Sequence, residues 1–394
     1  MQCVYILPCL SLCVRGLYIS MLDSQVDFGL QIYSRLVPGS SSNPLRQNLV
    51  FSPYGVSSVL GILQLGSSGE TLTTLTSRLG YSLQDPMSLQ KQHLLNVELS
   101  GEQVVQMASI MLVEQDMVLQ KGFLWALDKG FQSSPLPLDF SRPDEALSFV
   151  NSWVSEQTEG TIPVFLQPGI FTKDSRLVLL NAMNFKGPWK FPFDPKLTQE
   201  RPFLCSDGSS VVVPMMKNIR RYYCGCFVTA ASVEYNVVEL PYAWSNLSML
   251  LVAPVVRHIP LSVLTKELSV HSLQEWRAKL EKVPLKLTMP RFIIESELDL
   301  KASLSSEGLG NLFCQKNADF SRITTVEKLY VSNVLQRVKV EVNEEGTEGS
   351  SATAAILFAR MAVEEITLDR AFLFLIQHMP TGAVLFMGEV NRPQ

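Results

Sequence analysis

Hydrophobic and polar residues alternate most regularly between residues 334 and 342. One set contains Val334, Gln336, Val338, Val340 and Val342, and the other contains Leu335, Arg337, Lys339 and Glu341. Successive side chains of a strand point to opposite faces, so this period of two predicts a strand with one buried face. A short apolar run at residues 177–180 predicts a second strand.

A helical period precedes these strands. Apolar side chains recur at Ala146, Phe149, Val150, Trp153 and Val154. Ser141 suits the N-cap, Pro143 suits the first turn, and Gly160 suits the end of the helix. The pattern therefore predicts an amphipathic surface helix that begins at Ser141.

Two apolar runs near the C-terminus predict a buried hairpin. They cover residues 372–376 and 383–387, and the segment between them contains Pro380 and Gly382, which favour a turn. No internal repeat of 20 to 50 residues occurs, which disfavours solenoids and propellers. Helical and strand signals are mixed along the chain.

The segment from residue 343 to residue 369 has no steady period and is longer than common connections. Between Gly346 and Ala359 the only charged residue is Glu348. In a strand, one face of this segment would carry only uncharged residues, namely Thr347, Gly349, Ser351, Thr353, Ala355 and Leu357. Composition leaves two interpretations open: a protease-sensitive linker, and a segment able to enter a sheet.

Arg360 is a single cation within the extended stretch 358–361. A trypsin-like protease binds arginine through a buried carboxylate in its specificity pocket, so the bond between Arg360 and Met361 is a candidate cleavage site. Glu364 and Glu365 follow, and they would attract a basic rim on a protease. The alternative for this pair is two solvated acids on a loop.

Composition excludes several classes of protein. The chain has 394 residues, of which 46% are hydrophobic and 18% charged, as in folded proteins. A formal net charge of −4 and the absence of long Lys/Arg runs argue against nucleic-acid binding. No apolar stretch reaches the roughly 18 to 20 residues that a helix needs to span a bilayer.

The N-terminus differs from the rest of the chain. Residues 4–14 form an apolar block that ends at Arg15, and its length suits a signal peptide. No basic residue precedes the block, and no Ala-x-Ala cleavage site follows it. We expect residues 1–23 to be a signal peptide and residues 24–394 to form one domain of a secreted, extracellular protein. The sequon at Asn246 would then be glycosylated.

Enzymatic and metal chemistry have little support in the sequence. No nucleophile elbow, His-Glu-x-x-His helix, phosphate-binding loop or dinucleotide-binding turn occurs. Four cysteines lie in the body of the chain, at Cys205, Cys224, Cys226 and Cys314. No histidine stands near Cys224 and Cys226 to complete a zinc site. We therefore expect ordinary thiols, no metal, no cofactor and no catalytic residue.

Sequence motifs along almost the whole chain, from about Gln25 to Pro393, resemble those of the serpins. They are Asn48 to Pro53, Asn151 with Trp153, Leu180 to Gly187 with Trp189, Pro290 to Phe292, Ala318 to Ser321, and Thr381-Gly382 with Leu385 to Gly388. Finer details, notably Gln336 and the stretch 359–366, are similar to the serpins that inhibit plasminogen activators.

The resemblance implies an α+β serpin fold, with three β-sheets, about nine helices and a metastable native state. It implies an exposed reactive-centre loop at about residues 345–366, which inserts into the central sheet after a protease attacks Arg360. It assigns the reactive bond Arg360–Met361, the protease exosite Glu364 and Glu365, the loop hinge Gly346, Thr347, Glu348 and Gly349, and the sheet-opening residues Ser52, Asn181, Trp189 and Gln336.

For function, the resemblance implies a monomeric inhibitor of tissue-type and urokinase-type plasminogen activators that regulates fibrinolysis. Glu348 and Gly349 depart from the small or apolar residues of inhibitory serpins, so a non-inhibitory binding or carrier serpin stays the alternative. Vitronectin is a candidate partner, although its contacts do not map individually onto residues 106–140. Heparin is not expected, because its site in relatives needs several basic residues on one helix and the corresponding stretch here offers only Arg78, Lys91 and His93.

Overall fold

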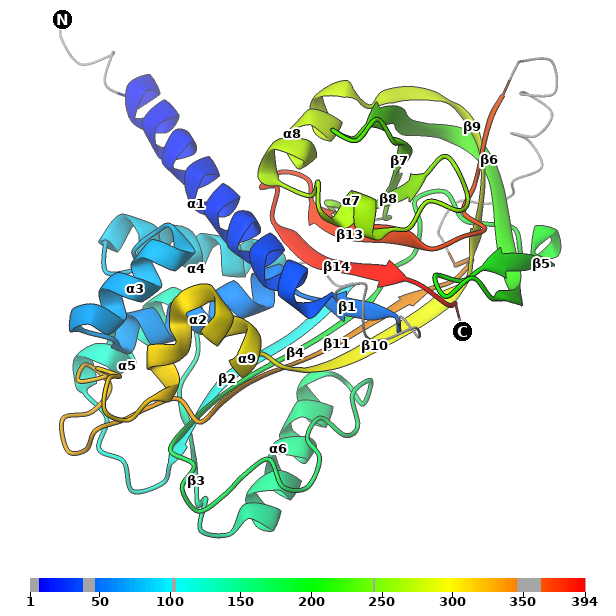
Figure 1. The fold of residues 1–394 in the computed structure, drawn as a ribbon. Coiled ribbons are helices and arrows are strands. Elements are labelled where there is room, and N and C mark those ends of the chain that lie inside the picture. Colours follow the sequence, from blue (N-terminus) through cyan, green and yellow to red (C-terminus); the bar gives the residue numbers. More distant parts are fainter. Residues whose placement is uncertain (1–6, 38–46, 101–103, 244, 346–362, 394) are drawn as a thin grey trace, which may run out of the picture.

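The computed structural model describes residues 7–37, 47–100, 104–243, 245–345 and 363–393. Nine α-helices lie within these ranges: α1 (Leu7–Leu36), α2 (Pro53–Gly66), α3 (Gly69–Leu79), α4 (Pro86–Ser100), α5 (Lys121–Phe131), α6 (Pro143–Gln157), α7 (Ser262–Thr265), α8 (Val270–Lys279) and α9 (Lys301–Leu304). Together with two sheets they form the α+β fold that the sequence predicts (Figure 1).

A five-stranded sheet crosses the middle of the molecule in the order β10-β11-β4-β2-β3 (Figure 1). Its strands are β2 (Val105–Glu114), β3 (Leu136–Leu138), β4 (Leu177–Lys186), β10 (Phe292–Asp299) and β11 (Asn333–Val342). β11 and β4 are parallel neighbours, paired from Asn333 with Val178 to Glu341 with Lys186. β10 is antiparallel to β11, and β2 is antiparallel to β4.

Both strands predicted for this sheet are confirmed. The alternating segment forms β11, and the apolar run at residues 177–180 is the first part of the longer β4. Nearly all of β4 is buried, because α6 covers one face of the sheet while α2 and the second sheet lie on the other (Figure 1). Two-sided burial explains why β4 begins as an apolar run rather than with alternation.

The other described strands pair into one nine-stranded sheet. They are β1 (Leu49–Phe51), β5 (Gln199–Leu204), β6 (Ser210–Val228), β7 (Glu234–Pro241), β8 (Leu247–Pro254), β9 (Glu281–Pro290), β12 (Glu364–Thr367), β13 (Phe372–His378) and β14 (Val384–Val390). The predicted C-terminal hairpin is β13 with β14. Three sheets were expected. Two are found among the described strands, because the 19-residue β6 pairs first with β5 and β9 and then with β7.

Helix α6 begins two residues later than the sequence predicts. Arg142 is its N-cap residue and makes no side-chain cap, so the predicted cap at Ser141 is wrong. The Ser141 hydroxyl instead donates to the carboxylate of Asp139, which competes with a helical cap. Phe149 is 49% exposed rather than packed on the sheet.

The buried stripe of α6 is narrower than the predicted one. It consists of Ala146, Val150 and Val154, which pack in one hydrophobic cluster with side chains such as Ile110 of β2 and Val178 of β4. A spacing of four residues keeps these side chains on one face of the helix. The helix therefore lies on the sheet along a single line of contact.

Helix α1 points away from the body at its N-terminal end (Figure 1). Towards its C-terminal end it joins the core, where Met21 and Leu22 are 5% and 2% exposed. The Gln274 side chain of α8 donates to the Asp23 carboxylate at 3.1 Å. No helix in the part of the chain that the structure describes is long and apolar enough to cross a membrane.

Candidate functional site

A buried polar bridge joins β11 to its parallel neighbour β4. The Gln336 amide donates from Nε2 to Oδ1 of Asn181 at 2.8 Å and to the Ser52 carbonyl at 3.1 Å. Its Oε1 accepts from the Ser52 backbone N–H at 2.9 Å. All three residues are at most 1% exposed. The structure therefore brings together three of the four predicted sheet-opening residues.

Hydrogen bonds at the start of α2 hold Ser52 in position. It is the N-cap residue, and its Oγ accepts from the Gly55 backbone N–H at 3.0 Å. The same hydroxyl donates to the Leu385 carbonyl of β14 at 2.6 Å. A Cβ at Gly55 would lie 2.1 Å from Oδ1 of Asn181, so only glycine lets the helix approach the amide this closely.

The bridge continues to a third strand through Ser109 of β2. Asn181 donates from Nδ2 to Oγ of Ser109 at 2.8 Å, and the two residues are directly opposite in the register. Gln336, Asn181 and Ser109 therefore form a polar row across β11, β4 and β2. Sequence analysis missed Ser109, because a single serine inside an apolar strand gives no distinct signal.

Trp189, the fourth predicted residue, lies where the chain leaves β11. Its ring stacks on Tyr242 with centroids 4.4 Å apart, and its indole N–H donates to the Asn343 carbonyl at 2.8 Å. Its backbone N–H donates to the Glu345 carbonyl at 2.9 Å. Trp189 thus holds the last described residues before residue 346, at the end of the sheet away from Asn333.

Glu344 makes further contacts that hold the chain where it leaves β11. Its carboxylate accepts from the Thr198 hydroxyl at 2.8 Å and lies 3.8 Å from the Arg291 guanidinium. Its carbonyl accepts from the Phe193 backbone N–H at 3.1 Å. Sequence analysis assigns this acid no role, since two adjacent acids usually lie on a solvated face.

A surface ion pair joins the last two paired residues of the parallel strands β4 and β11. Nζ of Lys186 in β4 lies 2.8 Å from Oε1 of Glu341 in β11. The hydrogen bond to Glu341 raises the pKa of Lys186, against a smaller opposing effect of burial. β11 and β4 are therefore linked by side chains in the middle and at the end nearest the loop.

The predicted loop residues lie outside the described part of the chain. These are the hinge Gly346, Thr347, Glu348 and Gly349 and the reactive bond Arg360–Met361. The described chain stops at Glu345 after β11 and resumes at Val363 before β12. β12 pairs in parallel with β9, so both attachments of the loop are on strands.

The two predicted exosite acids differ in their surroundings. Both Glu364 and Glu365 are exposed on β12, and strand alternation sends their side chains to opposite faces. Glu365 forms an ion pair with Lys286 of β9 at 2.8 Å. The negative charge of Glu364 contributes, after burial, to raising the pKa of the Cys224 thiol to about 11.

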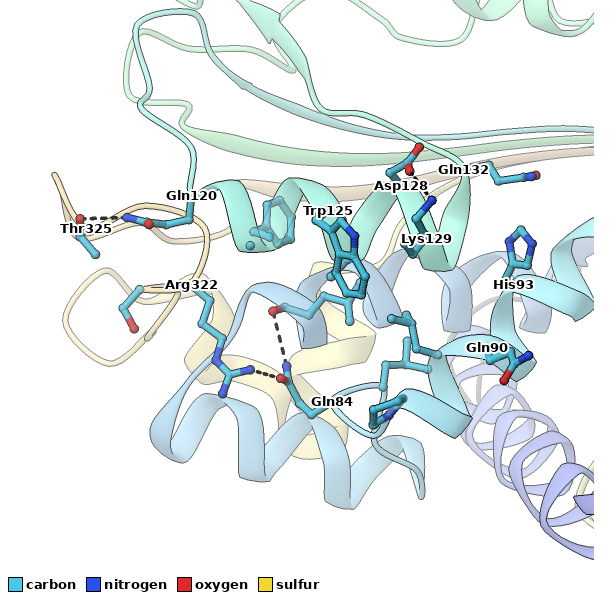
Figure 2. Close-up of a pocket in the computed structure, with 18 residues that line it drawn as sticks. Gln84, Gln90, His93, Gln120, Trp125, Asp128, Lys129, Gln132, Arg322 and Thr325 are labelled. Carbon is cyan, nitrogen blue, oxygen red and sulfur yellow. Dashed lines mark hydrogen bonds and ion pairs between the residues drawn. The ribbon is translucent and has the colours of Figure 1, made fainter. Parts of the chain in front are cut away.

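The remaining predicted residues are at separate places. Asn246 is exposed immediately before β8. Cys205, Cys224, Cys226 and Cys314 are not joined in disulfides. In the helix compared with heparin-binding serpins, Lys91 is 6% exposed. His93 lines a cavity of about 940 Å³ between α4 and α5, together with Trp125 and Lys129 (Figure 2).

Comparisons with known proteins agree with this architecture. The family profile "Serpin (serine protease inhibitor)" matches residues 23–393. Plasminogen activator inhibitor 1 of Bos taurus is 40% identical over 370 residues, which cover 93% of this chain and 91% of that protein. The predicted resemblance to inhibitors of plasminogen activators is thus confirmed.

Two solved structures share the fold. Native protease nexin-1, crystallised with heparin, superposes with a TM-score of 0.87 at 34% identity, covering 95% of this chain and 100% of that one. Human thyroxine-binding globulin, complexed with thyroxine, gives 0.83 at 27% identity, covering 96% and 100%. The family and the inhibitor relatives make this chain a protease inhibitor rather than an enzyme. The chain belongs to the serpin family.

Proposed function

We propose that this serpin is a suicide inhibitor of trypsin-like serine proteases, with the tissue-type and urokinase-type plasminogen activators as targets and Arg360–Met361 as the reactive bond. Regulation of fibrinolysis would follow. The proposal is supported by the 40% identity to plasminogen activator inhibitor 1 and by the sequence of the loop.

The observation that carries the proposal is the parallel pairing of β11 with β4. A chain that leaves the end of β11 and folds back runs antiparallel to β11, and it would also run antiparallel to β4. Insertion between them would replace one parallel ladder by two antiparallel ladders. Antiparallel pairing is slightly more stable per residue than parallel pairing. The sheet with the loop inserted would therefore be lower in free energy than the sheet without it.

Residues 346–359 have a composition that suits this insertion. Alternate residues from Thr347 to Leu357 are uncharged, so one face of the new strand would bury no charge. The new strand would also satisfy its backbone N–H and C=O groups through both neighbours. Glu348 falls on the opposite face.

Inhibition requires that the loop inserts faster than water hydrolyses the ester between serpin and protease. The serine oxygen of the protease attacks the Arg360 carbonyl carbon, and the peptide bond to Met361 breaks. The Met361 amine leaves with a proton, and an ester joins Arg360 to the protease. Insertion of the loop would displace the protease before water cleaves this ester.

The direct test mixes the purified protein with urokinase-type plasminogen activator and resolves the products on a denaturing gel. We expect a covalent band for the wild type and none for Arg360→Ala. Thr347→Arg should be cleaved without trapping, because a charged hinge side chain cannot be buried. Absence of a wild-type band with several trypsin-like proteases would contradict the proposal.

We also propose secretion after loss of an N-terminal segment and a glycan on Asn246. The sequence predicts a segment of residues 1–23, whereas the burial of Met21 and Leu22 favours a cut before Met21. Support comes from the N-terminal part of α1, which projects from the body (Figure 1), and from the exposure of Asn246. Mass spectrometry of the secreted protein would give the mature N-terminus. A mass loss on deglycosylation, absent in Asn246→Gln, would place the glycan.

The alternative is a binding or carrier serpin, for which thyroxine-binding globulin is a structural precedent. The gel test distinguishes the two functions, since a carrier would be cleaved by the protease without forming a covalent complex. We do not propose heparin as a partner, because Lys91 is buried and His93 faces a cavity. Vitronectin and a monomeric state stay predictions.

A further inference from the structure

The outer face of the nine-stranded sheet beside β12 carries several cations. In the register, Ile219 of β6, Lys286 of β9 and Glu365 of β12 lie side by side. Lys217 and Arg221 are each two residues from Ile219 and therefore project from the same face. This face, defined by Lys217, Arg221, Lys286 and Glu365, holds three cations and one acid.

Glu365 is the acid in this group, and Lys286 neutralises it. Nζ of Lys286 lies 2.8 Å from Oε1 and 2.9 Å from Oε2 of Glu365. The side chains are only 29% and 48% exposed, respectively, so the pair is partly shielded from water. An incoming cation would have to compete with Lys286 for the carboxylate.

Among the described residues, neither Lys217 nor Arg221 forms an ion pair, although the charge of Glu365 acts on Lys217 as a smaller, opposing effect. Burial, followed by repulsion from Lys286 and Arg201, lowers the pKa of Lys217, as expected where like charges crowd together. Glu364, the other predicted exosite acid, points to the opposite side of β12. The outer face therefore remains cationic despite the two adjacent acids in the sequence.

We propose that Lys286 is a specificity-determining residue. By pairing with Glu365 it removes the acid that would attract a basic protease rim, and it leaves a cationic face beside the C-terminal attachment of the reactive loop. This face selects trypsin-like proteases that carry acidic groups on the facing rim. The inference rests on the proposed function, since it concerns how the same loop chooses its protease.

The test measures docking without chemistry, so that it does not depend on trapping. One trypsin-like protease is prepared with its active-site serine replaced by alanine, in two forms with either three lysines or three glutamates added on the rim. Binding constants are measured for the wild type, Lys286→Ala, Lys286→Arg and Lys282→Ala. Lys282 lies on the same strand and carries the same charge, but it sits over the Tyr223 ring rather than on Glu365.

We expect the wild type to bind the acidic-rim form about 3- to 10-fold more tightly at low salt, with the preference reduced at about 0.5 M salt. Lys286→Ala should gain affinity for the basic-rim form, and adding Glu365→Gln should abolish that gain. Lys286→Arg should behave as the wild type, and Lys282→Ala should show no gain that depends on Glu365.

Two results would overturn the inference. The first is an equal response to Lys286→Ala and Lys282→Ala, and the second is a wild-type preference for the basic-rim form. Thermal melting verifies that each variant folds. Covalent bands with the active protease test the proposed function separately, so a failure of the inference is distinguishable from a failure of the proposed function.

Discussion

Gln336 performs several hydrogen-bonding tasks with one side chain. It ties β11 to β4 through Asn181, and it satisfies both backbone groups of Ser52. Any insertion between the two strands has to break the bond to Asn181 while the bonds to Ser52 persist on the β11 side. Gln336 therefore adds a buried side-chain link to the backbone ladder and the Lys186–Glu341 ion pair that also hold the two strands together.

Gln336→Ala should lower the free energy of unfolding by about 1–3 kcal/mol, because it leaves buried polar groups of Ser52 and Asn181 without partners. Denaturant unfolding measures this, and the half-life of inhibitory activity at 37 °C should shorten in parallel. The matched control is Glu297→Gln, which weakens an exposed pair with Arg337 and should change stability by less than about 0.5 kcal/mol. Equal effects of the two variants would contradict the prediction.

At this scale the sequence predicted part of the site. Ser52, Asn181, Trp189 and Gln336 came from the resemblance, and Gln336 is also the one polar residue among four valines in its set. Ser109 and Lys286 could not be predicted, because their roles depend on which strand lies next to theirs. Register is a property of the folded sheet, and local periodicity does not contain it.

At the scale of elements, the loop depends on how easily residues 346–359 become a strand. Gly349 lowers strand preference, and Glu348 carries the only charge in the segment. These residues would be among the first to enter the sheet, beside the Trp189 contacts with Asn343 and Glu345. Slow entry would let more of the ester hydrolyse.

The double variant Glu348→Ala/Gly349→Ala should therefore trap a larger fraction of protease. We expect the molar ratio of serpin needed per protease inhibited to fall, with less cleaved serpin on the gel. Glu281→Ala, which removes an exposed acid far from the loop in sequence, should leave the ratio unchanged. A ratio that rises in the double variant would show that these two residues do not slow insertion.

Helix α1 gives a second prediction at this scale. Met21 and Leu22 lie in the core, and Gln25 is 4% exposed. A chain that begins at Met21 should match the full chain within about 0.5 kcal/mol. A chain that begins at Val26 should lose about 1.5–3 kcal/mol for each buried apolar side chain removed. Thermal unfolding of both purified chains decides this, and equal stability would contradict the burial of Met21 and Leu22.

Strands with a regular apolar pattern could be predicted from the sequence. Which strands pair within one sheet could not. The alternation of β11 and the C-terminal hairpin both follow from local period and turn residues. The predicted start of α6 was wrong because the Ser141 side chain donates a hydrogen bond to Asp139 rather than capping the helix. Phe149 was misplaced because four-residue spacing, rather than the full apolar set, faces the sheet.

At the scale of the whole molecule, the native fold should gain stability when its loop is cut. Cleavage within the loop by a protease that the serpin does not trap would free the loop to insert, exchanging the β11–β4 ladder for two antiparallel ladders. We expect the melting temperature to rise by about 10 °C or more.

The matched control is Thr347→Arg cleaved under the same conditions. Its hinge would have to bury a charge, so its melting temperature should stay near that of the intact protein. A cleaved wild type that melts no higher than the intact protein would favour the carrier alternative. Calorimetry before and after cleavage distinguishes these outcomes.

Strand β1 pairs with β14, and the Ser52 hydroxyl is satisfied by the Leu385 carbonyl, so early and late parts of the chain complete one structure. A ribosome releases Leu385 only after it has added 333 residues beyond Ser52. Until then β1 is an open edge and the start of α2 lacks a partner. The nascent protein must wait in an incomplete state, and a premature stop codon before Leu385 would leave it there permanently.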